Sequence, residues 1–455
     1  MLTINQENKY HLIGIGGDGM SGLARVLLQI GASVVGSDIR ESRNIEILRN
    51  SGAEVYIGHR KSNLSRDVDT VVVSSAIPDD NVEVREARRR GIPVQERLTT
   101  LASLMEEKKS VAIAGTHGKT TTTTMTSTIF EFGGKDPTFM IGANCEQLGG
   151  NAKLGDGEHF ISEVDESDGH FTELHPDISV ITNIGKDHLD TYKGQEEILD
   201  GFRQFVNQSK ETIICMDDDN SRKLYDDLDN PFTFGIEREA DLAANRISQS
   251  GIWTNFDLEL KGEKLGRVNL PAPGKHNVYN ALAALSLGYR SGMEFSRMTE
   301  ILREFQLPKR RFQVLQNNGS VIVDDYAHLP KEIEVTLDAV KKGWEPNRIL
   351  AVFQPHRFSR TKHINGQFGD SFKSADMVVI TGIYPASETP IPGVTSQLIQ
   401  KSVEKKKDEN VHRILEREEL YQFVNDELEE GDFLIGLGAG DIDQFTRTLA
   451  KSRLT

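Results

Sequence analysis

The sequence predicts an α/β protein with three domains, and three observations support this fold class. The chain has 455 residues, which suggests about three domains at roughly 150 residues per domain. Short apolar runs alternate with longer segments of helical pattern, as in parallel sheets with crossover helices. Two glycine-rich loops, around Gly16 and Gly118, each follow an apolar run and precede a helical segment. We expect a Rossmann-like N-terminal domain, a central P-loop-type ATPase domain with a parallel sheet, and a Rossmann-like C-terminal domain.

Composition argues against several classes of protein. The net charge of −16 argues against nucleic acid as a partner, because phosphate backbones require basic surfaces. No run of apolar residues is long enough for a transmembrane helix, and the polar N-terminus does not read as a signal peptide. Cys145 and Cys215 lack metal-ligand spacing, so we expect buried free thiols in a reducing cytosol. A cytoplasmic protein is expected, either as a monomer or as a homodimer.

The first predicted strand, which ends at Ile13, leads into a GxGxxG pattern formed by Gly14, Gly16 and Gly19. A helical segment follows, so a phosphate can bind at its N-terminus. The next predicted strand ends near Asp38, about where dinucleotide-binding folds place a ribose-binding acid. Taken alone, this domain leaves a nicotinamide-dependent oxidoreductase open as an alternative.

A third predicted strand, Val68–Val73, runs directly into Ser74 and Ser75. Ligands of open α/β sheets bind at the carboxyl ends of strands, so these hydroxyls are candidate ligand contacts. Asp18 is unexpected in this domain, because an acid beside a diphosphate site repels the ligand unless it points away. The charged segment Glu106–Lys109 then marks the first domain boundary.

The segment Gly115–Thr121 is the most informative stretch of the chain. It follows the apolar run Val111–Ala114 and precedes a threonine-rich helical segment. Glycines let the N–H groups of a loop point at phosphate oxygens, and the helix N-terminus adds a positive dipole end. Lys119 can reach the outer phosphates, and the Thr120 hydroxyl can ligate Mg²⁺. Ile113 stands where the common P-loop spacing has its first glycine, so a glycine turn with an exposed lysine is the alternative.

Two polar segments follow predicted strands in the central region. Glu163–Asp168 contains four acids, and Asn183–His188 follows the apolar run Ile178–Ile181. Carboxylates at strand ends beside a phosphate loop supply the hard oxygen ligands that Mg²⁺ prefers. The alternatives are a solvated turn for the first segment and a structural or surface role for His188.

Two further pairs of side chains are candidates for binding. Asn277 and Asn280 share one face of a predicted helix and could project into one site, or could simply lie at a capped helix start. Arg357 and Arg360 follow the predicted strand Ile349–Phe353, and their guanidinium groups are planar forks suited to anions. A surface-exposed basic turn is the alternative for the arginines.

These motifs occur in an order that resembles the Mur ligase family over nearly the whole chain. They are Gly-Thr-His-Gly-Lys-Thr, Glu-x-Asp-Glu-Ser-Asp, Thr-Asn-Ile-x-x-Asp-His-Leu-Asp, His-Asn-x-x-Asn-Ala, Arg-Arg-Phe and Asp-Asp-Tyr-Ala-His. The N-terminal glycine motif, Pro-His-Arg-Phe-Ser-Arg-Thr, Tyr-Pro-Ala and Gly-Ala-Gly-Asp-Ile resemble the members that join L-alanine to UDP-N-acetylmuramate. Several independent motifs in one order are more specific than any single motif.

The resemblance implies a UDP-sugar domain over residues 1–107, an ATP-binding domain over 108–307 and a C-terminal domain over 308–455 that closes on the nucleotide and the amino acid. It implies ATP and Mg²⁺ as cofactors. The residues expected to contact ATP are Gly115, Thr116, His117, Gly118, Lys119, Thr120, Thr121, Asn277, Asn280, Arg311 and Asp325. The expected metal ligands are Thr120, Glu163 and His188. The expected substrate contacts are Gly16, Gly17, Gly19, Ser74, Ser75, Tyr326, Arg357 and Arg360, and the expected catalytic residues are Lys119, Glu163, His188 and Arg357.

The implied reaction forms an acyl phosphate on the muramate carboxylate, which the amine of L-alanine then attacks, in peptidoglycan precursor synthesis. One departure from the pattern is Leu329, where this type of ligase commonly has a second histidine. The nearest alternative is a recycling ligase of the same fold that joins a preformed tripeptide to the same UDP-sugar. A folate-polyglutamate ligase fits the N-terminal glycine motif poorly. A nucleotide-switch binding protein without catalysis is the alternative from a different class.

Overall fold

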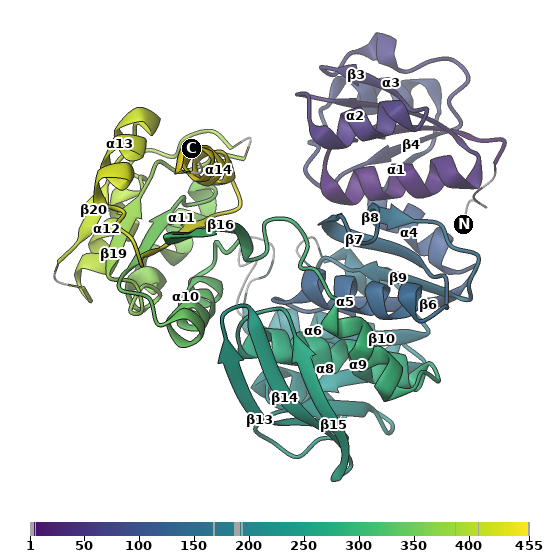
Figure 1. The fold of residues 1–455 in the computed structure, drawn as a ribbon. Coiled ribbons are helices and arrows are strands. Elements are labelled where there is room, and N and C mark those ends of the chain that lie inside the picture. The colour runs from purple at the N-terminus through teal and green to yellow at the C-terminus, as the bar shows by residue number, and fades with distance from the viewer. Residues whose placement is uncertain are drawn as a thin grey trace. The chain divides into compact units, whose positions relative to one another are not determined.

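The computed structural model describes residues 4, 6–166, 169–185, 192, 194–386, 388–407 and 409–453. Their strands form three sheets, of five, ten and six strands, which follow one another along the chain (Figure 1). Together with the helices between the strands, they confirm the predicted α/β fold of three domains. The chain divides into two compact units, Met1–Ala244 with Leu258–Gly266 and Tyr279–Leu302, and Asn245–Asp257 with Arg267–Val278 and Arg303–Thr455. Among the described residues, no helix has the length and apolar character needed to cross a membrane.

The N-terminal sheet has the strand order β3-β2-β1-β4-β5, and its neighbouring strands are all parallel. Its strands are β1 (Lys9–Ile13), β2 (Ser33–Asp38), β3 (Glu54–Ile57), β4 (Thr70–Val73) and β5 (Val94–Glu96). Its helices are α1 (Asp18–Ile30), α2 (Arg43–Asn50), α3 (Val82–Arg90) and α4 (Arg97–Met105), with the 3-10 helix η1 (Lys61–Asn63). The glycine-rich loop joins β1 to α1. It therefore lies where the strand order reverses, which is the ligand-binding position of such sheets.

The central sheet has the order β15-β14-β13-β12-β11-β10-β6-β9-β7-β8. Its strands are β6 (Lys109–Ala114), β7 (Thr138–Cys145), β8 (Gly150–Lys153), β9 (His159–Glu163), β10 (Ile178–Ile181), β11 (Glu211–Cys215), β12 (Phe232–Gly235), β13 (Leu242–Ser250), β14 (Trp253–Leu260) and β15 (Glu263–Leu270). Its helices are α5 (Lys119–Phe132), η2 (His170–Glu173), α6 (Gln195–Asn207), α7 (Asp219–Tyr225), α8 (Lys275–Arg290) and α9 (Phe295–Arg303). β6 is parallel to both of its neighbours, β9 and β10. The carboxyl ends of these three strands therefore meet at one edge of the sheet.

The C-terminal sheet has the order β16-β17-β21-β18-β19-β20, in which only the β16–β17 pair is antiparallel. Its strands are β16 (Gln313–Asn318), β17 (Ser320–Asp325), β18 (Ile349–Phe353), β19 (Met377–Ile380), β20 (Val411–Arg413) and β21 (Phe433–Leu437). Its helices are α10 (Pro330–Trp344), α11 (Phe358–Ile364), η3 (Asn365–Asp370), α12 (Gln397–Glu404), α13 (Arg417–Glu427) and α14 (Ile442–Arg453). The parallel strands with crossover helices agree with the predicted Rossmann-like unit.

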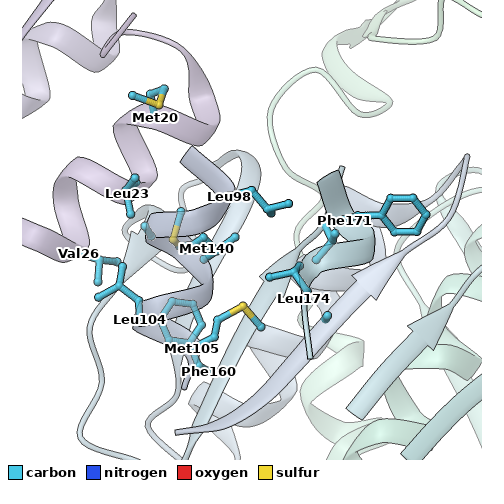
Figure 2. Packing of buried hydrophobic residues seen from close by; sticks show 14 of the residues in the cluster. Met20, Leu23, Val26, Leu98, Leu104, Met105, Met140, Phe160, Phe171 and Leu174 are labelled. Atoms are coloured by element: carbon cyan, nitrogen blue, oxygen red, sulfur yellow. The ribbon is translucent and has the colours of Figure 1, made fainter. Parts of the chain in front are cut away.

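One hydrophobic cluster extends from the N-terminal sheet into the central sheet. Leu23 of α1, Leu104 of α4, Met140 of β7 and Phe160 of β9 all belong to it, and Figure 2 shows them gathered between the two domains. Helix α1 also contacts β7 and β8. At the edge of this contact, Asn151 donates from Nδ2 to the Asp18 carbonyl at 2.9 Å. The first two domains therefore share a core within one compact unit.

Candidate functional site

The ATP loop predicted from the sequence joins the end of β6 to the start of α5, which begins at Lys119. Gly115 and Gly118 have φ angles of +137° and +82°, a range that favours glycine. A Cβ atom on Gly115 would lie 2.2 Å from the Thr182 hydroxyl oxygen, and one on Gly118 would lie 2.4 Å from Asn280 Oδ1. Both conformation and space therefore require glycine at these two positions.

Residues at the end of β10 hold this loop in place. The N–H of His117 donates to Asn183 Oδ1 at 3.0 Å, and Asn183 Nδ2 donates back to the His117 carbonyl at 2.8 Å. Thr182 donates from its hydroxyl to the same carbonyl at 2.8 Å, and the Thr116 hydroxyl accepts from the N–H of Gly185 at 2.7 Å. The sequence indicated a polar segment here but not that Asn183 braces the loop.

Lys119 lies inside the loop that it follows. Its ammonium donates to the Gly115 carbonyl at 2.7 Å and to Glu166 Oε2 at 2.6 Å. Burial opposes the charge of Lys119, but the carboxylates of Glu166, Asp165 and Glu163 outweigh it and raise the pKa of the lysine. Lys119 is therefore a cation at any ordinary pH and can hold phosphate oxygens. Glu166, one of three acids that the sequence left undistinguished, contacts the lysine.

Thr120 and Glu163 form the pair expected to bind magnesium. The Thr120 hydroxyl donates to Glu163 Oε1 at 3.0 Å, while Glu163 Oε2 accepts from the N–H of Gly142 at 2.9 Å. One hydroxyl and one carboxylate are hard oxygen donors, and they leave most positions to water and phosphate, as Mg²⁺ prefers. The pair therefore fits the ion. Among the described residues no group of three His, Cys, Asp or Glu side chains could hold a metal, and His188 lies outside them.

The N-terminal glycine loop is held by polar side chains from β2 and α2. Asp38 accepts the N–H of Gly16 at 2.9 Å through Oδ2 and the N–H of Ile39 at 2.7 Å through Oδ1. Asn44 donates to the Gly16 carbonyl at 3.0 Å and to Asp18 Oδ1 at 3.0 Å. Both oxygens of Asp38 thus accept backbone N–H groups, and Asp38 holds the glycine loop in place. The Asp18 carboxylate, unexpected beside this loop, accepts a hydrogen bond from Asn44.

Ser74 and Ser75 follow the end of β4, next to the same loop. The N–H of Ser74 donates to the Ile13 carbonyl at 3.4 Å, and a Cβ on Gly14 would lie 3.5 Å from the Ser74 Cβ. Ser75 is exposed. The structure therefore brings the two serines and the glycine loop, including Gly17 and Gly19, to one edge of the N-terminal sheet.

The two asparagines of α8 have different surroundings. Asn280 accepts from the Thr122 hydroxyl at 3.2 Å through Oδ1 and lies against Gly118 of the ATP loop. Asn277 instead donates to the Pro273 carbonyl at 2.7 Å, within the turn that precedes its own helix. The structure therefore places Asn280 against the loop, while Asn277 binds the turn before its helix.

In the C-terminal domain, the Asp325 carboxylate organises two backbone turns. It accepts the N–H of Phe312 at 2.6 Å and that of Ala327 at 2.7 Å, and burial raises its pKa. The guanidinium of Arg311 lies 4.8 Å from the centre of the Tyr326 ring. Arg310, which the sequence did not single out, contacts the same ring at 5.3 Å. Asp325 thus fixes the arrangement of Arg311 and Tyr326.

A cluster of rings lies beside the arginines predicted to bind anions. The ring of His356 stacks on Tyr384 at 5.7 Å and meets His328 edge-on at 5.7 Å. Burial, together with the charges of His328, Arg360 and Arg357, lowers the pKa of His356 to about 3. His356 is therefore neutral and accepts from Arg360 Nη1 at 3.1 Å through Nδ1. His356 and Tyr384 belong to motifs in the sequence that assigned them no role.

Arg357 itself has an unusual backbone and a buried donor. Its φ angle is +67°, which is uncommon for a residue other than glycine. Its Nε atom is buried and has no hydrogen-bond partner among the described residues. Strained residues of this kind cluster at ligand-binding sites. Leu329, the departure noted in the sequence, is buried at the start of α10 and packs in the domain core.

Sequence models of three Mur ligase domains match the chain in order. They are the Mur ligase family catalytic domain over residues 9–109, the middle domain over 113–288 and the glutamate ligase domain over 310–440. A UDP-N-acetylmuramate–L-alanine ligase from Trichlorobacter lovleyi is 44% identical over 97% of this chain and 98% of its own length. The chain belongs to the Mur ligase family. Another ligase of that name, from Geobacter sulfurreducens, is also 44% identical, over 96% of each chain.

Solved structures of Mur ligases and related enzymes have the same fold. A UDP-N-acetylmuramate-alanine ligase from Thermotoga maritima superposes with a TM-score of 0.85 at 29% identity, covering 98% of this chain and 99% of its own. A murein peptide ligase from Psychrobacter arcticus has a TM-score of 0.72 at 22% identity, covering 98% of each chain. This Mur ligase therefore has the three-domain architecture of the family along its whole length.

Proposed function

We propose that this Mur ligase uses ATP to join L-alanine to the carboxylate of UDP-N-acetylmuramate in peptidoglycan precursor synthesis. The observation that carries the proposal is the 44% identity, over 97% of this chain, to a ligase named for that reaction. The buried Lys119 and the Thr120–Glu163 pair beside it suit the ATP half of the reaction. Mg²⁺ bound at that pair supplies positive charge to the phosphates.

The chemistry requires an electrophile made from a carboxylate. In the first step an oxygen of the muramate carboxylate takes the terminal phosphoryl group of ATP, and ADP leaves. Lys119 offsets the charge as two anions approach each other. In the second step the amine of L-alanine attacks the acyl carbon, phosphate leaves, and the amine loses a proton. Neither step needs a covalent bond to the enzyme.

The remaining residues divide between the substrates. We assign the glycine loop around Gly16 and the serines Ser74 and Ser75 to the UDP-sugar. Asn277, Asn280, Arg311 and Asp325 are assigned to the nucleotide, the last by fixing Arg311. Tyr326, Arg357 and Arg360 are assigned to the amino acid, supported by the buried Nε of Arg357, which has no hydrogen-bond partner in the described part of the chain. His188 keeps its proposed place as a metal ligand.

We place the domain limits at residues 107 and 307, which fall between the three sheets. We also place the protein in the cytoplasm. The buried free thiols of Cys145 and Cys215 support this placement, since free cysteines are usual in a reducing compartment.

Phosphate release tests the proposed function. Turnover of Mg²⁺–ATP should require both UDP-N-acetylmuramate and L-alanine, and Lys119→Ala should abolish it. Lys405→Ala, at an exposed position far along the C-terminal domain sequence, is the control and should leave turnover unchanged. Turnover with the cell-wall tripeptide in place of L-alanine would assign a recycling ligase instead. Nucleotide binding without substrate-dependent phosphate release would favour a binding protein.

A further inference from the structure

The turn that carries Arg357 and Arg360 is held by a neighbouring segment of the C-terminal domain. The N–H of Arg357 donates to the Tyr384 carbonyl at 2.8 Å, and the N–H of Tyr384 donates to the Pro355 carbonyl at 2.8 Å. These bonds make a short parallel bridge between His356 and Tyr384. Because the φ angle of Arg357 is unfavourable, the turn needs such outside contacts to persist.

Glu388 supplies a second contact from the same neighbouring segment. Its Oε2 accepts the N–H of Ser359 at 3.0 Å, and its Oε1 accepts the Ser359 hydroxyl at 2.5 Å. Ser359 is the second residue of α11, and Arg357, at the N-cap position, forms no side-chain cap. The Glu388 carboxylate thus performs the capping role that the helix itself lacks.

The Glu388 carboxylate does not neutralise the neighbouring arginines. Arg357 and Arg360 flank Ser359 in the sequence, yet Glu388 forms no ion pair with either of them among the contacts of the described residues. Arg360 instead donates to His356. Both guanidinium groups therefore keep their charge for an external anion, while Glu388 fixes the backbone between them.

We propose that Glu388 is a positioning residue for the incoming amino acid. It holds the turn so that Arg357 and Arg360 are preset for the α-carboxylate before the amino acid arrives. Presetting lowers the conformational cost of binding. The inference rests on the proposed function, because it takes L-alanine as the ligand of this turn.

The kinetic test compares three Michaelis constants. Glu388→Ala should raise KM for L-alanine by about tenfold, from the loss of hydrogen bonds to a charged group, and leave KM for ATP and for UDP-N-acetylmuramate unchanged. Glu388→Gln, which keeps an acceptor, should recover part of the loss. Glu404→Ala, at an exposed position of α12, is the matched control. An equal rise in all three constants, or no rise for L-alanine, would overturn the proposal.

A double-mutant cycle tests whether Glu388 acts through Ser359. Ser359→Ala should raise KM for L-alanine less than Glu388→Ala does, and should add nothing when Glu388 is already alanine. Hydrogen exchange gives a readout that is independent of activity, since the amide of Ser359 should exchange faster in Glu388→Ala. Unchanged exchange there would contradict the proposed contact even in an active enzyme. If exchange rises but the wild type does not use L-alanine, the contact stands and the proposed function fails, and the role in amino-acid binding falls with it.

Discussion

At the scale of single residues, Lys119 is held in place by two hydrogen bonds and keeps a third N–H donor for a ligand. An ammonium group has three N–H donors, and two of them bind Gly115 and Glu166. Among the contacts within the described part of the chain, one donor therefore stays available for a phosphate oxygen. The neighbouring carboxylates outweigh the effect of burial and keep the ammonium group charged.

The Thr120 hydroxyl is expected to set the magnesium requirement. Thr120→Val preserves the shape of the side chain but removes the donor to Glu163. We expect the Mg²⁺ concentration for half-maximal phosphate release to rise by about tenfold or more, because a metal ligand is lost and even groups that only orient such ligands contribute that much. Thr120→Ser keeps the hydroxyl and should behave nearly as the wild type. An unchanged magnesium titration in Thr120→Val would remove Thr120 from the metal site.

His159 is expected to make stability depend on pH. It is 2% exposed, its ring nitrogens have no hydrogen-bond partner among the described residues, and burial lowers its pKa. The unfolded chain takes up this proton near pH 6.5 while the folded chain does not. Stability should therefore fall as pH drops below about 6.5, with a slope of at most about 1.4 kcal/mol per pH unit.

Urea unfolding between pH 5 and 7.5 tests this expectation. His159→Leu should reduce the pH dependence, to which the buried His356 also contributes, whereas the exposed His363→Gln should keep it. A constant difference in unfolding free energy between His159→Leu and the wild type at every pH would rule out this role for His159.

At this scale, the sequence allowed a role to be predicted for residues that lie in a recognisable motif. Lys119 and Thr120 could be named from the glycine loop that they follow, and Glu163 from the resemblance to the Mur ligase family. Glu388 and Arg310 could not, because their partners lie distant in the sequence. Glu388 binds Ser359 across 29 positions, and Arg310 donates to the Gly438 carbonyl across 128. Such contacts depend on the folded chain.

At the scale of elements, the order of three strands assembles the proposed ATP site. β6 carries the loop and lies between β9, which ends at Glu163, and β10, which leads to Asn183. Since the three strands are parallel, the loop, the Glu163 carboxylate and Asn183, which braces the loop, meet at one edge of the sheet. The start of α8 adds Asn280 from much further along the chain.

The fit between α8 and the loop predicts a severe effect of Gly118→Ala. The new methyl group would lie 2.4 Å from Asn280 Oδ1, at a φ angle of +82°. We expect ATP binding measured by calorimetry to weaken by at least about tenfold, because the loop must move from the phosphates. Gly134→Ala is a matched control, with a φ angle of +79° and open space around the added Cβ. Equal binding by both variants would contradict this fit.

Strands β15 and β16 were not predicted from the sequence, and the reason is physical. β15 has five exposed residues in succession at its start, and β16 is largely polar, with the sequence QVLQNN. Prediction of strands from sequence depends on buried, apolar or alternating positions, which these segments lack. The parallel strand β18, by contrast, is entirely buried and was predicted.

At the scale of the whole molecule, three domains were predictable from length and motif order, but their grouping was not. The charged segment before β6 suggested a boundary between independent domains. The structure instead places a continuous hydrophobic cluster across that boundary (Figure 2). Apolar side chains on α1 face a partner domain, which helical periodicity alone cannot reveal.

Leu23→Ala is expected to disturb both domains. Leu23 is fully buried in the shared cluster, and truncation of such a side chain costs about 2–5 kcal/mol. Hydrogen exchange should accelerate in β7 and β9 as well as in β1. Val71→Ala, in a separate cluster confined to the N-terminal domain, should accelerate exchange chiefly there. Protection of β7 and β9 that is unaffected by Leu23→Ala would show that the domains are energetically independent.

The shared core also limits how members of this family can be recombined. A chimera joined at residue 107 would pair α1 of one enzyme with β7 and β8 of another, and so mismatch Leu23 and Met140 at a close-packed boundary. Exchange of sugar specificity by grafting only the first hundred residues should therefore yield poorly folded protein. A graft that carries α1 together with its contacts on β7, β8 and β9 preserves the inherited packing.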